Sequence, residues 1–130
     1  MNIELISIAV SALAIVVSIV LFWIDFQRRK KTETLQELNH IFDLYYSLPG
    51  KDTNKNYKDL VVFMSHLDRF AVAVNTNIFD KKTVKTRAGI LMDSVYKEFV
   101  KEIAEQRRQQ FHREDYYEDT IQMINSIRGN

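Results

Sequence analysis

The chain has 130 residues, and 18 Lys and Arg nearly balance 17 Asp and Glu, for a net charge of +1. This balance lacks the strong basic excess of proteins that bind nucleic acid broadly, so no duplex partner is expected. The absence of cysteine excludes disulfides, thiolate zinc sites and thiol catalysis. Three glycines and one proline are few for sheets with tight turns, so the composition favours helices.

The first element in chain order is an uninterrupted apolar run from Leu5 to Ile24. A helix of about 20 apolar residues rises about 30 Å, which matches the hydrocarbon core of a bilayer. Trp23 lies at the downstream end, where aromatic rings favour the membrane interface. We therefore expect a transmembrane anchor region, residues 1–26, followed by a helical cytoplasmic domain, residues 27–130. A basic cluster closes the apolar segment: Arg28, Arg29, Lys30 and Lys31.

A cleaved signal peptide is the competing interpretation of this segment. It would place positive charge before a shorter apolar run, whereas this leader is Met-Asn-Ile-Glu and the basic cluster follows. The order favours a retained anchor. By the positive-inside rule, we expect a single-pass membrane protein with its N-terminus outside and its C-terminal domain cytoplasmic. The basic cluster can set this topology alone, and it can also hold anionic lipid headgroups.

One face of the apolar run carries small residues at helical spacing. Small residues let helix backbones approach closely, and serine hydroxyls can hydrogen bond between helices. This stripe is a candidate association face, so we expect a homo-oligomer, and a narrow wet pathway is a further option. The alternative is that each serine bonds a carbonyl of its own helix. The residues of the stripe are Ser7, Ser11, Ala14 and Ser18.

Four helical segments are predicted, which gives an all-α fold with an antiparallel cytoplasmic bundle of three to four helices. The first runs from about Asp25 to Leu48, continuous with the anchor, and ends at Pro49-Gly50. The others begin near Asn56, Asp80 and Asp115. Ile78 and Phe79 are expected to pack as a plug. The apolar positions expected to face the core are Leu35, Leu38, Ile41, Phe42, Tyr45, Leu48, Leu60, Met64, Leu67, Phe70, Ala71, Val74, Val84, Ala88, Leu91, Met92, Val95, Tyr96, Phe99, Ile103, Tyr117, Ile121, Ile124 and Ile127.

The sequence contains only half of one metal-binding pattern and no catalytic pattern. Glu37-x-x-His40 matches half of the Glu-x-x-His signature of di-iron bundles. The second half is missing, so we expect no metal, and His40 is interpreted as a surface or interface residue. The G-x-S-x-G and P-loop signatures are absent as well. We therefore expect no catalytic residues, no cofactor and no enzymatic activity.

The strongest candidate binding site is the junction of the second and third predicted helices. Free backbone amides at a helix N-terminus attract anions, and nearby lysines strengthen the attraction for a phosphate-bearing, nucleotide-like ligand. The alternative is a solubilising surface whose ion pairs contribute little. The candidate residues are Arg69, Asn75, Asn77, Lys81, Lys82, Lys85 and Arg87.

The stretch from Leu67 to Asp80, with Thr83-Val84-Lys85 and Met92-Asp93-Ser94-Val95-Tyr96 downstream, resembles a bacterial and phage-associated family whose domain has no known function. The resemblance covers essentially the whole chain. It implies a single N-terminal span in the bacterial inner (plasma) membrane, a basic stop and an all-helical domain, and it supplies no catalytic residues. The layout is also similar to small membrane effectors of antiviral systems, including those gated by cyclic oligonucleotides, in which a helical domain senses a signal and the spans damage the membrane.

Two functions follow from these patterns. The first is a membrane-anchored sensor or effector that self-associates and responds to a phosphorylated ligand or partner, with a role in antiviral defence. The alternative is a scaffold or tether that recruits a protein partner without ligand gating, on aromatic positions such as Tyr46, Tyr57 or Tyr116. Hydrolysis of a membrane or nucleotide substrate is a third and weaker option, for which no residues are found.

Overall fold

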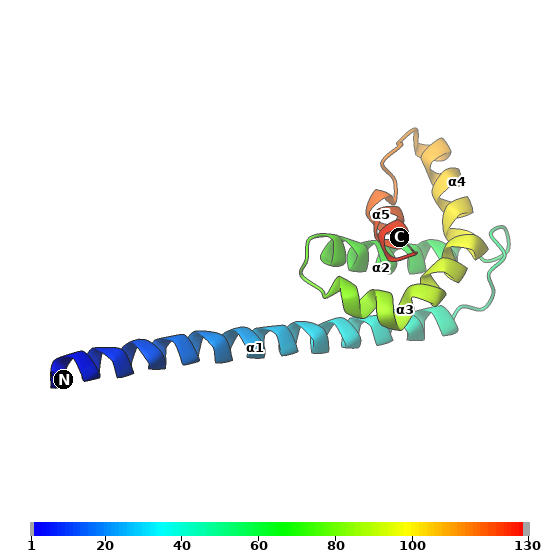
Figure 1. The fold of residues 1–130 in the computed structure, drawn as a ribbon. Coiled ribbons are helices and arrows are strands. Elements are labelled where there is room, and N and C mark those ends of the chain that lie inside the picture. The colour runs from blue at the N-terminus through cyan, green and yellow to red at the C-terminus, as the bar shows by residue number, and fades with distance from the viewer. Residues whose placement is uncertain (1, 129–130) are drawn as a thin grey trace.

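The computed structural model describes residues 2–128, so Met1 and Gly129–Asn130, at the ends of the two predicted regions, lie outside it. Within the described residues every regular element is helical, as predicted, and no strand occurs. Since α3, a π-helical segment and α4 follow one another without interruption, four helical bodies result, in agreement with the four predicted segments. The elements are α1 (Ile3–Tyr46), α2 (Tyr57–Asn75), α3 (Lys81–Val95), the π-helical segment (Tyr96–Val100), α4 (Lys101–Phe111) and α5 (Glu118–Arg128) (Figure 1).

Helix α1 is one unbroken helix of 44 residues, which confirms the continuity predicted between the apolar run and the first helix after it. Its first half projects as a bare rod, whereas its second half lies under the other helices (Figure 1). The apolar window of the rod is long enough and apolar enough to cross a membrane, and no part of it is buried against the chain. The helix ends at Tyr46, just before Pro49, which cannot continue a helix because it lacks an N–H donor.

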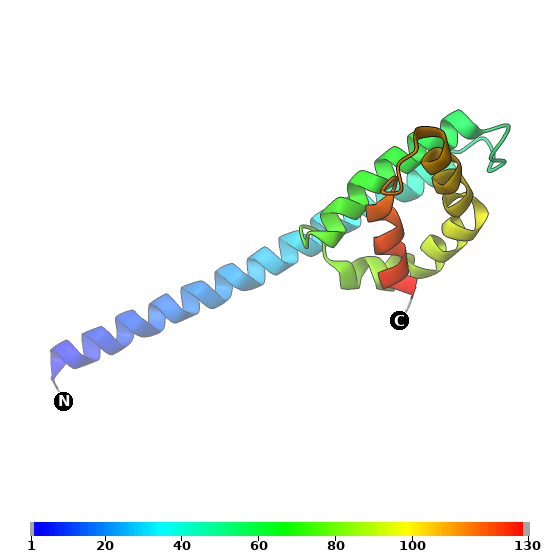
Figure 2. The same cartoon turned by 90° about the horizontal axis from the view of Figure 1, so that it is seen from above.

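The remaining helices form a compact head region (residues 27–128) around the second half of α1. Helix α2 runs back along α1 in the opposite direction, and α5 packs against both α2 and α3 (Figure 2). The core is apolar: Leu38 on α1, Leu67 on α2 and Ile124 on α5 are almost fully buried. Phe63 and Phe99 meet edge to face with their ring centroids 5.6 Å apart. Most predicted core positions are therefore buried, and Phe63, Val100 and Met123 join them. The exceptions are only partly buried: Leu35, Phe42, Leu48, Leu91, Tyr96 and Ile121.

The predicted third helix is continuous but bent. The wider π-helical turn at Tyr96–Val100 separates α3 from α4, which run in different directions (Figure 1). A π-segment places one extra residue in a turn, and such segments are a common cause of helix bends. Both Phe99 and Val100 are fully buried as a result, although they are adjacent in sequence. The bend lets one helical body cover two sides of the core.

Two local predictions are corrected by the structure. Ile78 does not pack as part of a plug, because its side chain is 61% exposed, whereas the ring of Phe79 lies tilted against that of Phe70 with the centroids 5.5 Å apart. The last helix begins at Glu118 and not near Asp115, because His112 and Tyr117 adopt left-handed backbone angles that keep the connection from α4 nonhelical. Tyr117 still faces the core, as predicted.

Candidate functional site

The structure distributes the seven predicted anion-binding residues over separate surfaces. Arg69 lies on α2 and faces α1, whereas the four predicted cations of α3 lie on its first two turns, and all five are exposed. The two groups line different grooves, so the structure does not bring them together. The cations of α3 are Lys81, Lys82, Lys85 and Arg87.

The two asparagines of the predicted site hold the turn in place. The side-chain amide of Asn75 donates to the backbone oxygen of Asp119 at 2.9 Å, which ties the end of α2 to the start of α5. The side-chain oxygen of Asn77 accepts a 3.0 Å hydrogen bond from the ammonium group of Lys30 on α1. Asn77 has a φ of 65°, a left-handed conformation that asparagine tolerates well. Both side chains thus have structural partners.

Three of the four cations of α3, Lys82, Lys85 and Arg87, line two grooves. In the first, between α1 and α3, Lys31, Lys82 and Arg87 surround a space of about 230 Å³ together with Asp80. The second, between α3 and α5, has about 760 Å³ and is lined by Lys85, Arg87, Asp93 and Arg128 among others.

The larger of these two grooves is partly neutralised by its own carboxylate. Arg128 forms a 2.6 Å ion pair with Asp93 and lies over the ring of Tyr96, and Lys97 pairs with the same carboxylate at 3.1 Å. The hydrogen bond from Lys97, followed by the charges of Lys97 and Arg128, holds the pKa of Asp93 below its ordinary value. An anionic ligand would have to displace these pairs.

A third groove lies between α1 and α2 and is here called the histidine groove. Its polar residues are Glu37 and His40 from α1 and His66 and Arg69 from α2, around a space of about 630 Å³. The two imidazole rings meet edge to face with centroids 6.1 Å apart. Neither Glu37 nor Arg69 takes part in any ion pair within residues 2–128. The floor is apolar and consists of Ile41, Phe70, Ala73 and Phe79.

The histidine groove combines a guanidinium group and two imidazoles with an aromatic floor. Arginine forms paired hydrogen bonds with phosphate or carboxylate oxygens, and aromatic rings favour flat apolar groups. Beside Arg69 the groove can therefore hold an anionic group that carries a flat apolar portion, whereas the carboxylate of Glu37 in the same lining repels anions. No group of three or more His, Asp or Glu side chains that could hold a metal ion occurs in the described part of the chain.

Sequence reasoning identified Arg69 but missed its neighbours in the groove. The signal that could have found them is the pair of polar residues three apart on each helix, Glu37 and His40 on α1 and His66 and Arg69 on α2. Residues three apart share one helix face. What sequence alone did not provide is that these two faces meet, because this depends on the register of α1 against α2.

The three tyrosines predicted to dock a protein partner differ in their exposure and in their contacts within the head. Tyr46 is 74% exposed at the end of α1. Tyr57 and Tyr116 are half-buried and belong to a cluster around Arg107, whose guanidinium group donates to the Tyr116 hydroxyl at 3.1 Å. Burial disfavours the charge of Arg107, but the hydrogen bonds to Tyr57 and Tyr116 outweigh this effect and raise its pKa. These two tyrosines are thus engaged within the head.

The predicted association face and basic cluster lie along α1. Every residue of the small-residue stripe is exposed on the bare rod, at Ser7, Ser11, Ala14 and Ser18. In the basic cluster, Arg29 forms an ion pair with Asp25, Lys30 bonds Asn77, and Arg28 and Lys31 are exposed.

A scan against family models and searches of the curated proteins and the solved structures found no match for this chain.

Proposed function

We propose that the chain is a single-pass protein of the bacterial inner membrane, with the head in the cytoplasm and the N-terminus outside. In this proposal the head is a small antiparallel helical bundle that binds an anionic, phosphate-bearing ligand and self-associates through α1. The protein acts as a sensor or effector without catalysis. The basic cluster after the apolar run supports the orientation, because the cytoplasmic ends of membrane spans are enriched in Lys and Arg.

The observation that carries this proposal is the continuity of α1 from the apolar rod to the wall of the histidine groove. Glu37, His40 and Ile41 line the groove and belong to the same unbroken helix as the apolar run ending at Ile24. The distance from Ile24 to His40 along the helix axis is about 24 Å at 1.5 Å per residue. A ligand that changes the contact between α1 and α2 therefore acts directly on the helix proposed to cross the membrane.

The chemistry of the histidine groove supports a nucleotide-like ligand. Arg69 and the imidazoles of His40 and His66 can donate hydrogen bonds to phosphate oxygens. The rings of Phe70 and Phe79 provide an apolar floor on which a base can lie. The lysines of α3 lie outside this groove. Of the seven residues predicted to bind an anion, only Arg69 lines it and would contact this ligand.

Ligand binding is tested with the full chain in lipid nanodiscs. Fluorescent derivatives of ATP, cyclic AMP and a cyclic dinucleotide are titrated, with inorganic phosphate as a competitor. Arg69→Ala removes a charged hydrogen bond and should weaken binding by about tenfold or more. Lys58→Ala, on an exposed position of the same helix, is the matched control and should leave binding unchanged.

The same titrations separate the histidine groove from the α3 lysines. If Lys81→Ala with Lys82→Ala weakens binding while Arg69→Ala does not, the ligand site belongs to the start of α3. If no probe binds to the wild-type chain at any accessible concentration, the sensor proposal is refuted for nucleotide-like ligands.

We extend the proposal to antiviral defence, because the layout is similar to that of small membrane effectors of such systems. In this role, ligand binding rearranges the association of the apolar helices and damages the membrane. Expression in a bacterial host should arrest growth during phage infection, and purified protein should release dye from vesicles when ligand is added. Growth and vesicle contents that stay unaffected under both conditions would contradict the effector role.

A scaffold is the second candidate, and exposed apolar side chains on the head favour it. Ile90 is 87% exposed on α3 and Tyr46 is 74% exposed at the end of α1. Tyrosine is enriched among the energetic anchors of protein interfaces. A specific protein that co-purifies with the wild type but not with Tyr46→Ala or Ile90→Ser, in cells that show no growth arrest, would favour the scaffold.

A further inference from the structure

The connection between α2 and α3, residues 76–80, lies beside α1 at the point where α1 leaves the head. Lys30 donates to the side chain of Asn77 at 3.0 Å, and the backbone N–H of Asp80 donates to the hydroxyl of Thr34 at 2.8 Å. In Figure 1 this connection is the end of the head that is nearest to the bare rod. Two hydrogen bonds thus fix the connection at the boundary between head and rod.

The position of this connection along α1 matches the surface of a bilayer. Lys30 follows Ile24, the last residue of the apolar run, by six positions, which corresponds to about 9 Å along the helix axis. The polar headgroup layer extends about 5–7 Å beyond each side of the hydrocarbon core. If the apolar run spans the core, the connection lies at the outer edge of the headgroups, within reach of lysine side chains.

This end of the head carries a surplus of exposed positive charge. Two pairs of exposed cations lie here, Arg28 and Lys31 on α1 and Lys81 and Lys82 on α3. The carboxylates of these segments are fewer than the cations: Asp25, which pairs with Arg29, Asp80, which accepts a hydrogen bond from Thr83, and the exposed Glu33.

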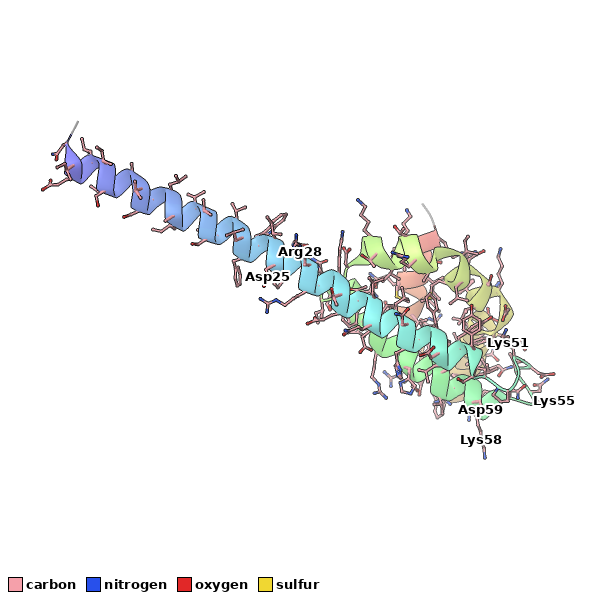
Figure 3. All side chains as sticks on the ribbon, turned by 90° about the horizontal axis from the view of Figure 1, so that it is seen from below. Asp25, Arg28, Lys51, Lys55, Lys58 and Asp59 are labelled. Atoms are coloured by element: carbon pink, nitrogen blue, oxygen red, sulfur yellow. The ribbon has the colours of Figure 1, made fainter. Side chains whose placement is uncertain are left out.

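The opposite end of the head differs in charge. Lys51, Lys55 and Lys58 lie there with Asp59 (Figure 3), and the carboxylates of Asp52 and Glu98 balance the remaining two lysine charges, with Lys51 paired to Glu98 at 3.6 Å. Asp25 and Arg28, in contrast, lie where the rod meets the head (Figure 3). The positive surplus is therefore a property of the end that faces the rod.

The same end also presents exposed apolar side chains. Ile78, in the connection between α2 and α3, is 61% exposed, and Phe26 on α1 is 53% exposed. Apolar side chains surrounded by lysines are typical of segments that rest in the interface of an anionic membrane.

We propose that the α2–α3 connection and the first turn of α3 dock on the cytoplasmic bilayer surface, with Ile78 inserted among the headgroups and Lys81 and Lys82 bound to anionic phospholipid headgroups. This inference rests on the proposed membrane span of α1. It assigns Lys81 and Lys82 to lipid and leaves the histidine groove to a soluble ligand. Docking holds the head at a fixed angle to the membrane, so the contact between α1 and α2 is set partly by the lipid.

The test uses the absence of native cysteine, because a single introduced cysteine carries a unique label. The full chain is labelled with a fluorophore at Ile78→Cys, at Lys55→Cys on the opposite end of the head, and at Val17→Cys within the apolar run. Nanodiscs are made of phosphatidylcholine alone or mixed with phosphatidylglycerol. They carry a nitroxide quencher either on the headgroup or on the acyl chain.

In discs that contain phosphatidylglycerol, the headgroup quencher should quench the label at Ile78→Cys strongly and the label at Lys55→Cys weakly. Each lysine near an anionic surface contributes about fivefold to the partition onto it. Lys81→Gln with Lys82→Gln should therefore lower the ratio of docked to undocked heads by about 25-fold. The matched control, Lys55→Gln with Lys58→Gln at the opposite end, should leave this ratio unchanged in the Ile78→Cys background.

Three results would overturn the docking inference. Equal quenching at Ile78→Cys and Lys55→Cys would show that the head does not rest on this end. Quenching at Ile78→Cys that is insensitive to phosphatidylglycerol and to the lysine substitutions would show that the two lysines do not bind anionic lipid. A response to inorganic phosphate in phosphatidylcholine discs, lost on substitution of the two lysines, would assign them to a soluble ligand.

The label at Val17→Cys separates this inference from the proposed span. Quenching of that label by the acyl-chain nitroxide supports the span, so that failure at Ile78→Cys then refutes docking alone. If the label at Val17→Cys is not quenched, the membrane span fails and the docking inference fails with it.

Discussion

The hydroxyl of Thr34 on α1 accepts a 2.8 Å hydrogen bond from the backbone N–H of Asp80, the residue that precedes α3. The same hydroxyl donates to the backbone oxygen of Lys30 at 2.7 Å, and the Thr34 side chain is fully buried. One side chain thus joins the long helix to the start of α3. This contact determines where the rod leaves the head, and with it the surface that faces the rod.

Thr34→Val should destabilise the head by about 1–3 kcal/mol, because the isosteric valine leaves the partly buried N–H of Asp80 without its acceptor. The measurement is urea unfolding of the full chain in mild detergent, followed by circular dichroism. Thr32→Val is the matched control, since Thr32 also bonds the carbonyl four residues before it but is exposed. It should change stability by less than about 0.5 kcal/mol. Equal effects of the two substitutions would contradict a special role for Thr34.

Phe99→Ala should cost about 3–5 kcal/mol in the same unfolding experiment, because it leaves a large cavity at the bend between α3 and α4. Phe99 is fully buried in the π-helical segment and packs edge to face on Phe63. Phe99→Leu keeps most of the volume and should cost less than about 2 kcal/mol. The control is Phe111→Ala at the end of α4, where the side chain is 46% exposed, and its loss should be the smallest. The reverse order would show that the core does not include the bend.

Asp93→Asn should remove part of the acid sensitivity of the head. The pKa of Asp93 is lowered from its ordinary value of 3.8 by the hydrogen bond from Lys97 and by the charges of Lys97 and Arg128. A lowered folded-state pKa means that the stabilisation is present above the unfolded-state pKa and is lost as the pH falls through the folded-state pKa. The difference in melting temperature between wild type and Asp93→Asn should therefore be largest near neutral pH and shrink below about pH 4.

The control for the acid experiment is Asp59→Asn, which removes an exposed carboxylate at the other end of the head. Its melting temperature should follow that of the wild type at every pH. If the wild type and Asp93→Asn differ by the same amount across the whole range, the ion pairs of Asp93 with Arg128 and Lys97 do not contribute to stability in solution.

Ser11→Ile combined with Ser18→Ile should abolish cross-linking between subunits in the membrane, because bulky side chains keep helix backbones apart. Both serines are exposed on the bare rod in the single chain. The matched control is Ala9→Ile combined with Ala12→Ile, which adds similar bulk on other faces of the same helix. Cross-linking should persist in the control. Unchanged cross-linking in the serine variant would refute the association face.

Much of the fold could be predicted from the sequence because helices are encoded locally. The apolar residues of α2 recur three or four positions apart, and Leu60, Met64, Leu67 and Val74 are buried as this spacing predicts. Asn75, a residue type that favours turns, is the last residue of α2. Pro49, which has no N–H to donate to a helix, follows the end of α1. The bend at Tyr96–Val100 could not be predicted, because no proline or glycine marks it and it follows from packing on both sides of the core.

The candidate sites depended on relations that no local pattern encodes. Sequence reasoning grouped Arg69 with the α3 lysines because they are close along the chain. The structure turns Arg69 toward α1, beside His40 and His66, and places Lys81 at the end of the head near the rod. Spacing along a helix fixes which residues share a face, but it does not fix which face of another helix they meet.

The sequence by itself determined the all-helical character, the helix boundaries to within a few residues, and the apolar segment long enough to cross a membrane. Each follows from interactions within about one turn, or from the hydrophobicity of a continuous segment. Only the tertiary structure decided that Glu37 and His40 face His66 and Arg69, and that the α2–α3 connection lies against Lys30 and Thr34. The physical reason is that these contacts join residues tens of positions apart, and the packing of the whole core sets the register of the helices that carry them.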